Sequence, residues 1–584
     1  MTIINYIKST RWLTAITILL SLGFASCTDY LNVDPKTSGK LLGDNFYQDS
    51  TQCFAALAAA YSGVRINTGG FYNQTVSMNS GSDECYAGGG GATDGGGLQN
   101  VSNYTLNSSN VGDDTSGPAY MWYNYYIGIN NCNILIANID KAVMSSGLKN
   151  RMIAECKALR AYYYFNLVRV WGNIPLLLES VSADAIYTPV QASASDVYKQ
   201  IEQDFTDAIS VLPSSLKSNE VGRLTQGAAT ALLGKVYLYE GDGIPGAKNS
   251  DGSATLAGDP SKYALAAQTL AKVNGSLSGT TFSSPYGYQL LTNFADLWSN
   301  KVSDASPLFG NAPGRFNSEA IFEDVHSNQA MMSWGNGNYS GKDVSNMMCT
   351  LVGPRQYSIN NVSPNPAPPL STAGAWSFNP ITPECVDFMQ SNMTGTDNRY
   401  TVSVFDMNYL FNNGPSGPVD PIDKDHDTKV YATYNAKGGY MNTGYFLNKF
   451  MPLKSDESHI GGDVVLNFQQ DAYIIRLADT YLMEAEALVR SGGDANRAKA
   501  LVNAVRVRAG ATPLASTPTL QQIWDERRLE LMGEGHRWFD LVRTGQAATV
   551  LAPRGFQASR NELFPIPYKE MQNPNFKQNY GYPQ

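Results

Sequence analysis

Apolar residues recur at helical spacing along much of the chain. Residues 118–145 show this well, since large apolar side chains fall about one helical turn apart between Trp122 and Ile139. The segment at 195–211 begins at a Ser/Asp pair that can cap a helix, and it stops before a proline. The pattern predicts helices at 52–66, 118–145, 151–170, 195–211, 225–240, 261–273, 383–391, 473–490, 494–508, 519–532 and 536–544.

Two long stretches lack this pattern. Residues 68–117 contain clusters of Gly, Ser, Asn and Asp, and residues 276–470 are rich in Asn, Gly, Pro and Ser. Both compositions favour turns and loops. Short strands are expected at 319–325 and 399–405. The sequence therefore predicts a mostly α protein with long, decorated loops.

Two predicted helix pairs have the residue spacing of a tetratricopeptide-like repeat, in which two antiparallel helices pack closely. In the pair 473–508 the small and apolar positions are Leu482, Ala485, Val489, Ala498, Val502 and Val505. In the pair 225–273 they are Gly234, Tyr237, Ala266, Leu270 and Val273. Glu486 stands at a normally small position, and a plain helical bundle explains the apolar residues nearly as well.

The composition argues against several classes of function. Only 16% of the 584 residues are charged, against roughly 25% in an average soluble domain, and the formal net charge is −9. Nucleic-acid binding needs a basic surface, and the sequence has no Lys/Arg stripe. Four His and seven scattered Cys without a CxxC pair argue against zinc-ribbon and thioredoxin-type chemistry. A polar, weakly charged surface suits neutral polar ligands.

The N-terminus has the features of an export signal. Two basic residues precede an apolar run at 12–24, which is shorter than the roughly 20 residues that span a bilayer. Small residues then precede Cys27, as in a bacterial lipobox. We expect residues 1–26 to be a lipoprotein signal peptide and Cys27 to carry acyl chains such as palmitate, which anchor a protein stably when several are attached. An ordinary signal peptide is the alternative.

Eight sequence blocks follow one another along the chain: CTDYLNVDP (27–35), SDECYAGGGGATDGG (82–96), MWYNYYIGINNCNILI (121–136), ECKALRAYYYFNLVRVWGNIPLL (155–177), AYIIRLADTYLMEAEALVRSGG (472–493), ALVNAVRVRAG (500–510), IWDERRLELMGEGHRWFDLVRTG (523–545) and LFPIPYKEMQNPNFKQNYGY (563–582). Together they resemble the SusD/RagB family of outer-membrane nutrient-binding lipoproteins of the Bacteroidetes. The resemblance implies about four tetratricopeptide-like helix pairs with a loop-rich ligand-binding lobe. The helical regions would be 27–275, with a ligand loop at 68–117, and 471–584, and the variable lobe would be 276–470.

The resemblance also implies a function. Members of the family capture oligosaccharides, or sometimes peptides, without catalysis, and they cover a TonB-dependent transporter of the SusC type at the cell surface. We therefore expect a lipid-anchored, surface-exposed binding protein without a cofactor. The alternatives are a surface-anchored glycoside hydrolase, a peptide-binding member of the same family, and a tetratricopeptide adaptor that binds only a protein partner.

The block at 523–545 contains several carboxylates and one His, and it invites a catalytic interpretation. A glycosidase needs two carboxylates about 5–10 Å apart on opposite sides of the sugar. Glu526, Glu530 and Glu534 follow one another at i,i+4 spacing and would share one helix face. We therefore predict that the acidic residues of the block pair with Arg527, Arg528 and Arg537. Trp538 and Phe539 are expected in the core.

Candidate ligand-binding residues lie in the loops, because sugars are bound by aromatic platforms and by polar side chains. The Gly-rich run lacks the lysine of a phosphate loop. The resemblance implies that this run is a binding loop, which is favoured over a merely flexible one, with Asp83, Glu84, Tyr86 and Asp94 as its polar or aromatic residues. Further candidates are Tyr286, Tyr288, Trp334, Asn336, Asn338, Tyr339 and Trp376, with Arg355 as a hydroxyl clamp.

Two other patterns are given a structural interpretation. Asp423, Asp425 and Asp427 alternate as in the first half of a calcium loop, but the Gly and Glu that complete such a loop are missing. A solvated acidic turn is therefore favoured over a structural calcium site. Trp122, Trp171 and Trp298 are predicted to lie in the core.

Overall fold

The computed structural model describes residues 46–180, 188–298, 315–326, 332–333, 345–355, 375–406, 439–452, 456–458 and 461–583. Within these ranges no helix is both long enough and apolar enough to cross a bilayer. Helices dominate the described residues, and the strands pair in twos. The predicted mostly α class is therefore confirmed.

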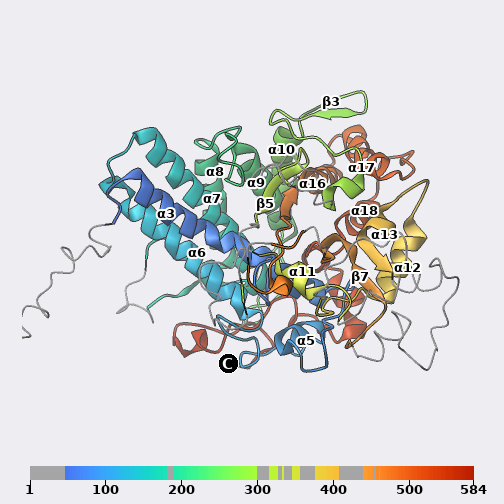
Figure 1. The fold of residues 1–584 in the computed structure, drawn as a ribbon, viewed down its shortest axis with the longest axis horizontal. Helices are drawn as coiled ribbons and strands as arrows, with labels where there is room; N and C mark the ends of the chain where they lie inside the picture. Colours follow the sequence, from blue (N-terminus) through green and yellow to red (C-terminus); the bar gives the residue numbers. More distant parts are fainter. Residues whose placement is uncertain are drawn as a thin grey trace, which may run out of the picture.

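Helix pairs form a row that runs from left to right in Figure 1. The pairs are α3 (Ser50–Tyr61) with α6 (Ala119–Asn138), α7 (Ser146–Trp171) with α8 (Ala194–Ile209), α9 (Gln226–Asp242) with α10 (Ser261–Asn274), and α16 (Leu477–Ser491) with α17 (Ala495–Ala509). Each pair also packs on the next, through α6 on α7, α8 on α9 and α10 on α16. This is the stacked arrangement of a helical repeat protein.

The close approach of α9 and α10 depends on small residues. A Cβ atom at Gly234 would lie 2.6 Å from Cγ of Leu270, and one at Gly241 would lie 2.6 Å from the ring of Tyr263. The two contacts run in opposite directions along the two helices, so the pair is antiparallel. Glu486, at a normally small position of α16, is buried and pairs with Arg543 at 2.8 Å.

Most helix boundaries agree with the sequence within a few residues, because the caps are local. Thr519 caps α18 (Leu520–Leu531) in a reciprocal capping box with Gln522, and Thr225 accepts from the N–H of Ala228 at the start of α9. Further helical segments are α12 (Pro383–Asn392), α19 (Arg537–Arg543), α20 (Ala547–Val550), α11 (Met347–Leu351), η1 (Ser62–Asn67), η2 (Ile139–Lys141), η4 (Phe294–Trp298), η7 (Asn448–Phe450), η9 (Val464–Leu466), η10 (Ala552–Arg554) and η11 (Glu570–Gln572).

One predicted helix and one predicted strand need correction. The predicted helix 473–490 begins only at Leu477, because β8 (Ala472–Arg476) is a buried strand that pairs antiparallel with β5 (Ala320–Asp324). The predicted strand 399–405 is instead α13 (Arg399–Ser403) followed by β6 (Val404–Asp406), which pairs with β7 (Tyr445–Leu447). The remaining pairs are β1 (Ile174–Pro175) with β2 (Gln191–Ala192) and β3 (Ser276–Ser278) with β4 (Thr281–Ser283).

The stretch 68–117 is not devoid of helix, contrary to the sequence prediction. It contains α4 (Gln74–Gly81) and α5 (Gly96–Ser102). The whole of α4 is buried, and the side chain of Asn73 caps it by accepting from the N–H of Val76 at 2.9 Å. Tertiary burial therefore outweighs the poor helix propensity of its Ser, Asn and Gly residues.

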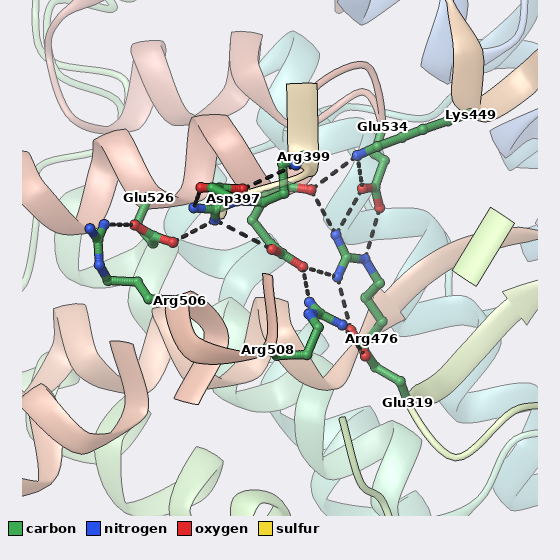
Figure 2. Close-up of polar contacts among 10 residues, drawn as sticks. Glu319, Asp397, Arg399, Lys449, Arg476, Arg506, Arg508, Glu526 and Glu534 are labelled. Carbon is green, nitrogen blue, oxygen red and sulfur yellow. Dashed lines mark hydrogen bonds and ion pairs between the residues drawn. The ribbon is translucent and has the colours of Figure 1, made fainter. Parts of the chain in front are cut away.

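The C-terminal block builds a buried ion-pair cluster (Figure 2). Arg476 at the end of β8 lies 2.6 Å from Glu530 and 2.8 Å from Glu534, while Glu526 lies 2.5 Å from both Arg399 and Arg506. These three glutamates of the block therefore do pair with basic residues, but their partners come from other segments. Arg527 pairs with Asp540 of the same block, as predicted, and also with Asp479, while Arg528 and Arg537 pair with Asp83.

The predicted core tryptophans are confirmed as buried, with Trp122, Trp171 and Trp538 at most 2% exposed and Trp298 8% exposed. One core runs through the helix pairs. A second core lies under α4, α5, α11 and α12 and contains Phe378 and Met348. The loops that follow α4 and precede α12 are built on this second core.

Candidate functional site

The Gly-rich loop at 88–97 packs against the chain around Phe378. The N–H of Gly89 donates to the carbonyl of Ser377 at 2.8 Å, and Gly88 bridges to Phe378. A Cβ atom at Gly88 would lie 2.3 Å from that Ser377 carbonyl oxygen, so this approach requires glycine. The loop is therefore held in one position by backbone contacts to a segment far away in the sequence.

Four half-buried side chains gather where these segments meet: Phe71, Asp94, Arg355 and Trp376, which we call the loop site. Nη1 of Arg355 donates to Oδ2 of Asp94 and to the carbonyl of Trp376, both at 3.1 Å. Oδ2 of Asp94 also accepts from the N–H of Gly90 at 2.7 Å. The ring centroids of Phe71 and Trp376 are 6.0 Å apart. The ion pair of Arg355 and Asp94 thus lies next to the two aromatic rings.

The buried side of the loop site fixes these aromatic rings. Phe71 packs edge-on against buried Phe378 at 5.1 Å between centroids, and a Cβ atom at Gly95 would lie 3.2 Å from the Phe71 ring. Ser377 and Asn379, on either side of Phe378, have φ values of 64° and 50°. Non-glycine residues adopt this left-handed region at a cost, and such strain gathers at functional sites.

The structure brings together residues that the sequence suggested separately. Asp94, Arg355 and Trp376 were each candidates, and they lie in direct contact. Phe71 was missed, although the aromatic pair Phe71-Tyr72 between two glycines and an asparagine resembles the other candidate loops. Tyr72 is also half-buried, and burial together with Asp94 raises the pKa of its phenol.

Asp83 and Glu84 are engaged within the fold. The carboxylate of Asp83 lies 2.8 Å from Arg537 and 2.9 Å from Arg528. Oε2 of Glu84 accepts from the N–H of Gly533 at 3.0 Å, and burial raises the pKa of Glu84 to about 7. Both residues therefore connect the loop to the C-terminal block, and we leave them out of the loop site.

Tyr86 adjoins this connection. The guanidinium of Arg554 lies 5.2 Å from the ring centroid of Tyr86, within cation–π range, and the Tyr86 N–H donates to the carbonyl of Pro380 at 3.0 Å. Burial raises the pKa of the Tyr86 phenol. Its half-buried ring is held by Arg554. Its role in ligand binding stays a prediction.

Tyr286 and Tyr288 lie in a different place, against the start of α9. Their ring centroids are 5.9 Å apart, and they line a pocket of about 280 Å³ together with Arg223, Phe316 and Glu323. The Tyr288 hydroxyl lies 3.2 Å from Oγ1 of Thr225, and burial raises the pKa of Tyr288 to about 12. This pocket shares no lining residue with the loop site.

Several candidates lie outside the described residues: Cys27, Trp334, Asn336, Asn338, Tyr339, Asp423, Asp425 and Asp427. Their roles remain predictions. In the part of the chain that the structure describes, no three His, Cys, Asp or Glu side chains gather in a way that could hold a metal ion.

The loop site has the chemistry of a binding surface for a neutral, polar ring. The faces of Trp376 and Phe71 offer apolar area, while Arg355 and Asp94 offer donors and acceptors without adding net charge. Asp94 is already engaged by Arg355 and Gly90. A glycosidase would need a second carboxylate opposed to it across the sugar. Glu526, Glu530 and Glu534 cannot provide one, because they lie in the buried cluster.

Comparison with known families agrees with the blocks in the sequence. The SusD family profile, SusD_RagB, matches residues 319–582. A second profile, SusD-like_3, described as starch-binding associating with outer membrane, matches residues 92–238. The two profiles cover the C-terminal helices and the helices around the loop site.

Curated relatives match over nearly their full length. SusD-like protein P25 of Formosa agariphila is 24% identical over 585 residues, which cover 95% of this chain and 96% of the relative. The starch-binding protein SusD of Bacteroides thetaiotaomicron is 23% identical over 614 residues, with 99% of each chain covered.

Solved structures share the fold. Surface glycan-binding protein A from Bacteroides thetaiotaomicron in complex with laminarihexaose is 23% identical, with a TM-score of 0.70 over 91% of this chain and 100% of that one. A laminarin-binding SusD-like protein is 40% identical, with a TM-score of 0.76 over 92% of this chain and 100% of that one. On this identity and coverage, the chain belongs to the SusD/RagB family.

Proposed function

We propose that this protein captures a neutral glucan of the laminarin type at the loop site and leaves it intact. The observation that carries the proposal is the contact between the Arg355–Asp94 ion pair and the aromatic pair of Phe71 and Trp376. A relative that is 40% identical over 92% of this chain is named as laminarin-binding, which supports the choice of glucan. Other relatives are also named as binding proteins.

Physical reasoning supports a sugar over a peptide. A pyranose has apolar C–H faces and a rim of hydroxyls, so it fits an aromatic platform beside paired donors and acceptors. A charged peptide would have to compete with the ion pair for the same groups. With 16% charged residues in the chain, the protein offers few ionic partners elsewhere.

The cellular setting is part of the proposal. We infer that Cys27 carries the lipid anchor, that the protein faces the outside of the outer membrane, and that it passes its glucan to a SusC-like TonB-dependent transporter. Membership of the SusD/RagB family supports these inferences, as does the profile description of association with the outer membrane.

Calorimetric titration with laminarihexaose tests the proposal. Trp376→Ala should weaken binding about ten- to a hundredfold, because stacking on an aromatic side chain contributes roughly 1–3 kcal/mol in the well-measured case of nucleic-acid bases. Trp524→Ala is the matched control, since Trp524 is also half-buried but lies on α18 beside Glu486. The control should bind as the wild type does.

Two results would contradict the proposal. If Trp376→Ala binds laminarihexaose normally while the wild type binds it well, the loop site is not the platform. If prolonged incubation with a clean preparation yields shorter sugars by chromatography, the protein is a hydrolase. Thermal melts of all variants would show that the fold is kept.

A further inference from the structure

A second pocket lies beside the N-terminal half of α6. It has a volume of about 420 Å³, within the usual range for a small-molecule site. It lies where α6 meets the chain around Pro175 and the C-terminal segment. Its walls combine aromatic rings with amide and carboxyl groups: Trp122, Tyr123, Tyr126, Pro175, Leu177, Pro189, Lys569, Glu570, Gln572, Asn573 and Phe576. We call it the α6 pocket.

The aromatic wall of the α6 pocket is rigid. The Tyr126 hydroxyl donates to the carbonyl of Pro175 at 2.8 Å, and its ring packs on Trp122 at 5.1 Å and on Tyr164 at 6.4 Å between centroids. Trp122 in turn packs edge-on against buried Trp171 at 5.3 Å. A ligand would therefore meet preformed rings and would not have to order them, which lowers the cost of binding.

Polar side chains of the C-terminal segment complete the lining of the pocket. The Asn573 side chain donates to the carbonyl of Pro189 at 2.9 Å, which fixes the C-terminal wall. Burial raises the pKa of the Glu570 carboxyl and of the Tyr123 phenol, and these two groups interact with each other. Lys569 and Asp114 stand exposed at the rim, 3.9 Å apart. The pocket thus offers hydroxyl partners without a fixed excess of one charge.

The chain between the loop site and the start of α6 is closely packed. Tyr72, next to Phe71, packs at Gly97, where a Cβ atom would lie 3.0 Å from the Tyr72 ring and 2.5 Å from Cα of Gly117. The turn before Gly117 holds Asp113, whose charge raises the pKa of both Tyr72 and Tyr123. One turn therefore separates the aromatic residues of the two places.

We propose that the α6 pocket is a second carbohydrate subsite, which binds further rings of a long neutral glucan whose other part occupies the loop site. This rests on the proposed function. Like the loop site, the α6 pocket combines aromatic rings with polar side chains, and a single turn lies between the two. Two linked sites raise the affinity for a long chain because the second contact is intramolecular.

The test compares long laminarin with laminarihexaose by calorimetric titration of the full chain. Tyr123→Ala should lower the affinity for long laminarin about tenfold or more and leave hexaose binding unchanged. Gln572→Trp should have the same effect, because Gln572 is exposed and a bulky side chain there would fill the pocket without disturbing the core. Tyr568→Ala is the control, since Tyr568 is 59% exposed and lies outside the pocket.

The outcomes separate the two proposals. If both pocket variants bind long laminarin as tightly as the wild type, the second subsite is wrong, while hexaose binding that depends on Trp376 would still support the loop site. If Trp376→Ala keeps weak binding of long laminarin and addition of Gln572→Trp abolishes it, the second subsite is supported. If the wild type binds neither glucan, both proposals fail.

Discussion

Replacement of Arg476 by Met should strongly destabilise the protein, because its guanidinium holds three buried carboxylates together (Figure 2). Its nitrogens lie 2.9 Å from Glu319, 2.6 Å from Glu530 and 2.8 Å from Glu534. Nη2 also donates to the carbonyl of Glu530 at 2.9 Å. All of these side chains are at most 3% exposed. Met keeps the stem of the side chain and removes the charge.

The magnitude follows from what remains after this guanidinium is removed. Glu319 and Glu530 still have Arg508 as a partner. Glu534 still has Lys449 at 2.7 Å. Each carboxylate keeps one partner, but the buried cluster is left with one more carboxylate than cations. We therefore expect a loss of about 3–5 kcal/mol, the usual cost of leaving a buried charge uncompensated. Cooperative unfolding of a chain this long carries about 1.2 kcal/mol/K of entropy, so Tm should fall by about 3–4 °C.

The pH dependence makes the test sharper. Carboxylates that lose a cation take up protons more readily, which relieves their repulsion as the pH falls. The loss of stability in Arg476→Met should therefore be larger at pH 8 than at pH 5. Thermal and urea unfolding at both pH values measure it. The control is Lys199→Met, whose pair with Asp196 is 70% and 56% exposed and should contribute nothing measurable. A loss in Arg476→Met as small as in this control would refute the reasoning.

Two further predictions follow from the same charges and from the N-terminus. The wild type should lose stability as the pH falls from about 4.5 toward 2. Burial favours the neutral form of Glu530, but the charges of Arg508, Arg476 and Arg399 outweigh it and lower the pKa of Glu530 to about 2. A carboxyl group whose pKa is lowered by folding stabilises the protein above its unfolded pKa, and this stabilisation is lost as the group is protonated. Melting curves that stay flat between pH 5 and pH 3 would contradict this. Cys27→Ala should leave the protein unacylated and outside the membrane fraction, as measured by labelling with a palmitate analogue, and persistent label would show that the anchor lies elsewhere.

The helix pairs could be predicted because their signals are local. Apolar spacing and caps such as Thr519 lie within a few residues of each other. Helix α4 could not be predicted, because its Ser, Asn and Gly residues have poor helix propensity and its stability comes from burial against distant segments. One such contact joins Asn79 to the carbonyl of Gly533, 454 residues away. The strand β8 was missed for the same reason, since its partner β5 lies more than 140 residues before it.

The candidate site also combines residues that local sequence indicates with contacts that only the tertiary structure reveals. Composition identified Asp94, Arg355 and Trp376 one at a time, but 261 residues separate Asp94 from Arg355, and no local pattern indicates that they touch. The loop sequence also made Asp83 a candidate, like Asp94. Its partner Arg537, 454 residues later, turns Asp83 into part of the framework. A loop sequence can therefore indicate which residue types bind a sugar, while tertiary contacts decide which of them are available.

Packing restricts the residues on the buried side of the loop site more than those on its open side. On the buried side, Gly88 lies too close to the Ser377 carbonyl to accept a side chain, and Phe378 fills the second core beneath Phe71. Changes there would move the whole loop. On the open side, Trp376 and Arg355 are only half-buried. The same framework can therefore carry different ligand-facing side chains, so the fold determines where a ligand binds and the exposed residues determine which ligand it is.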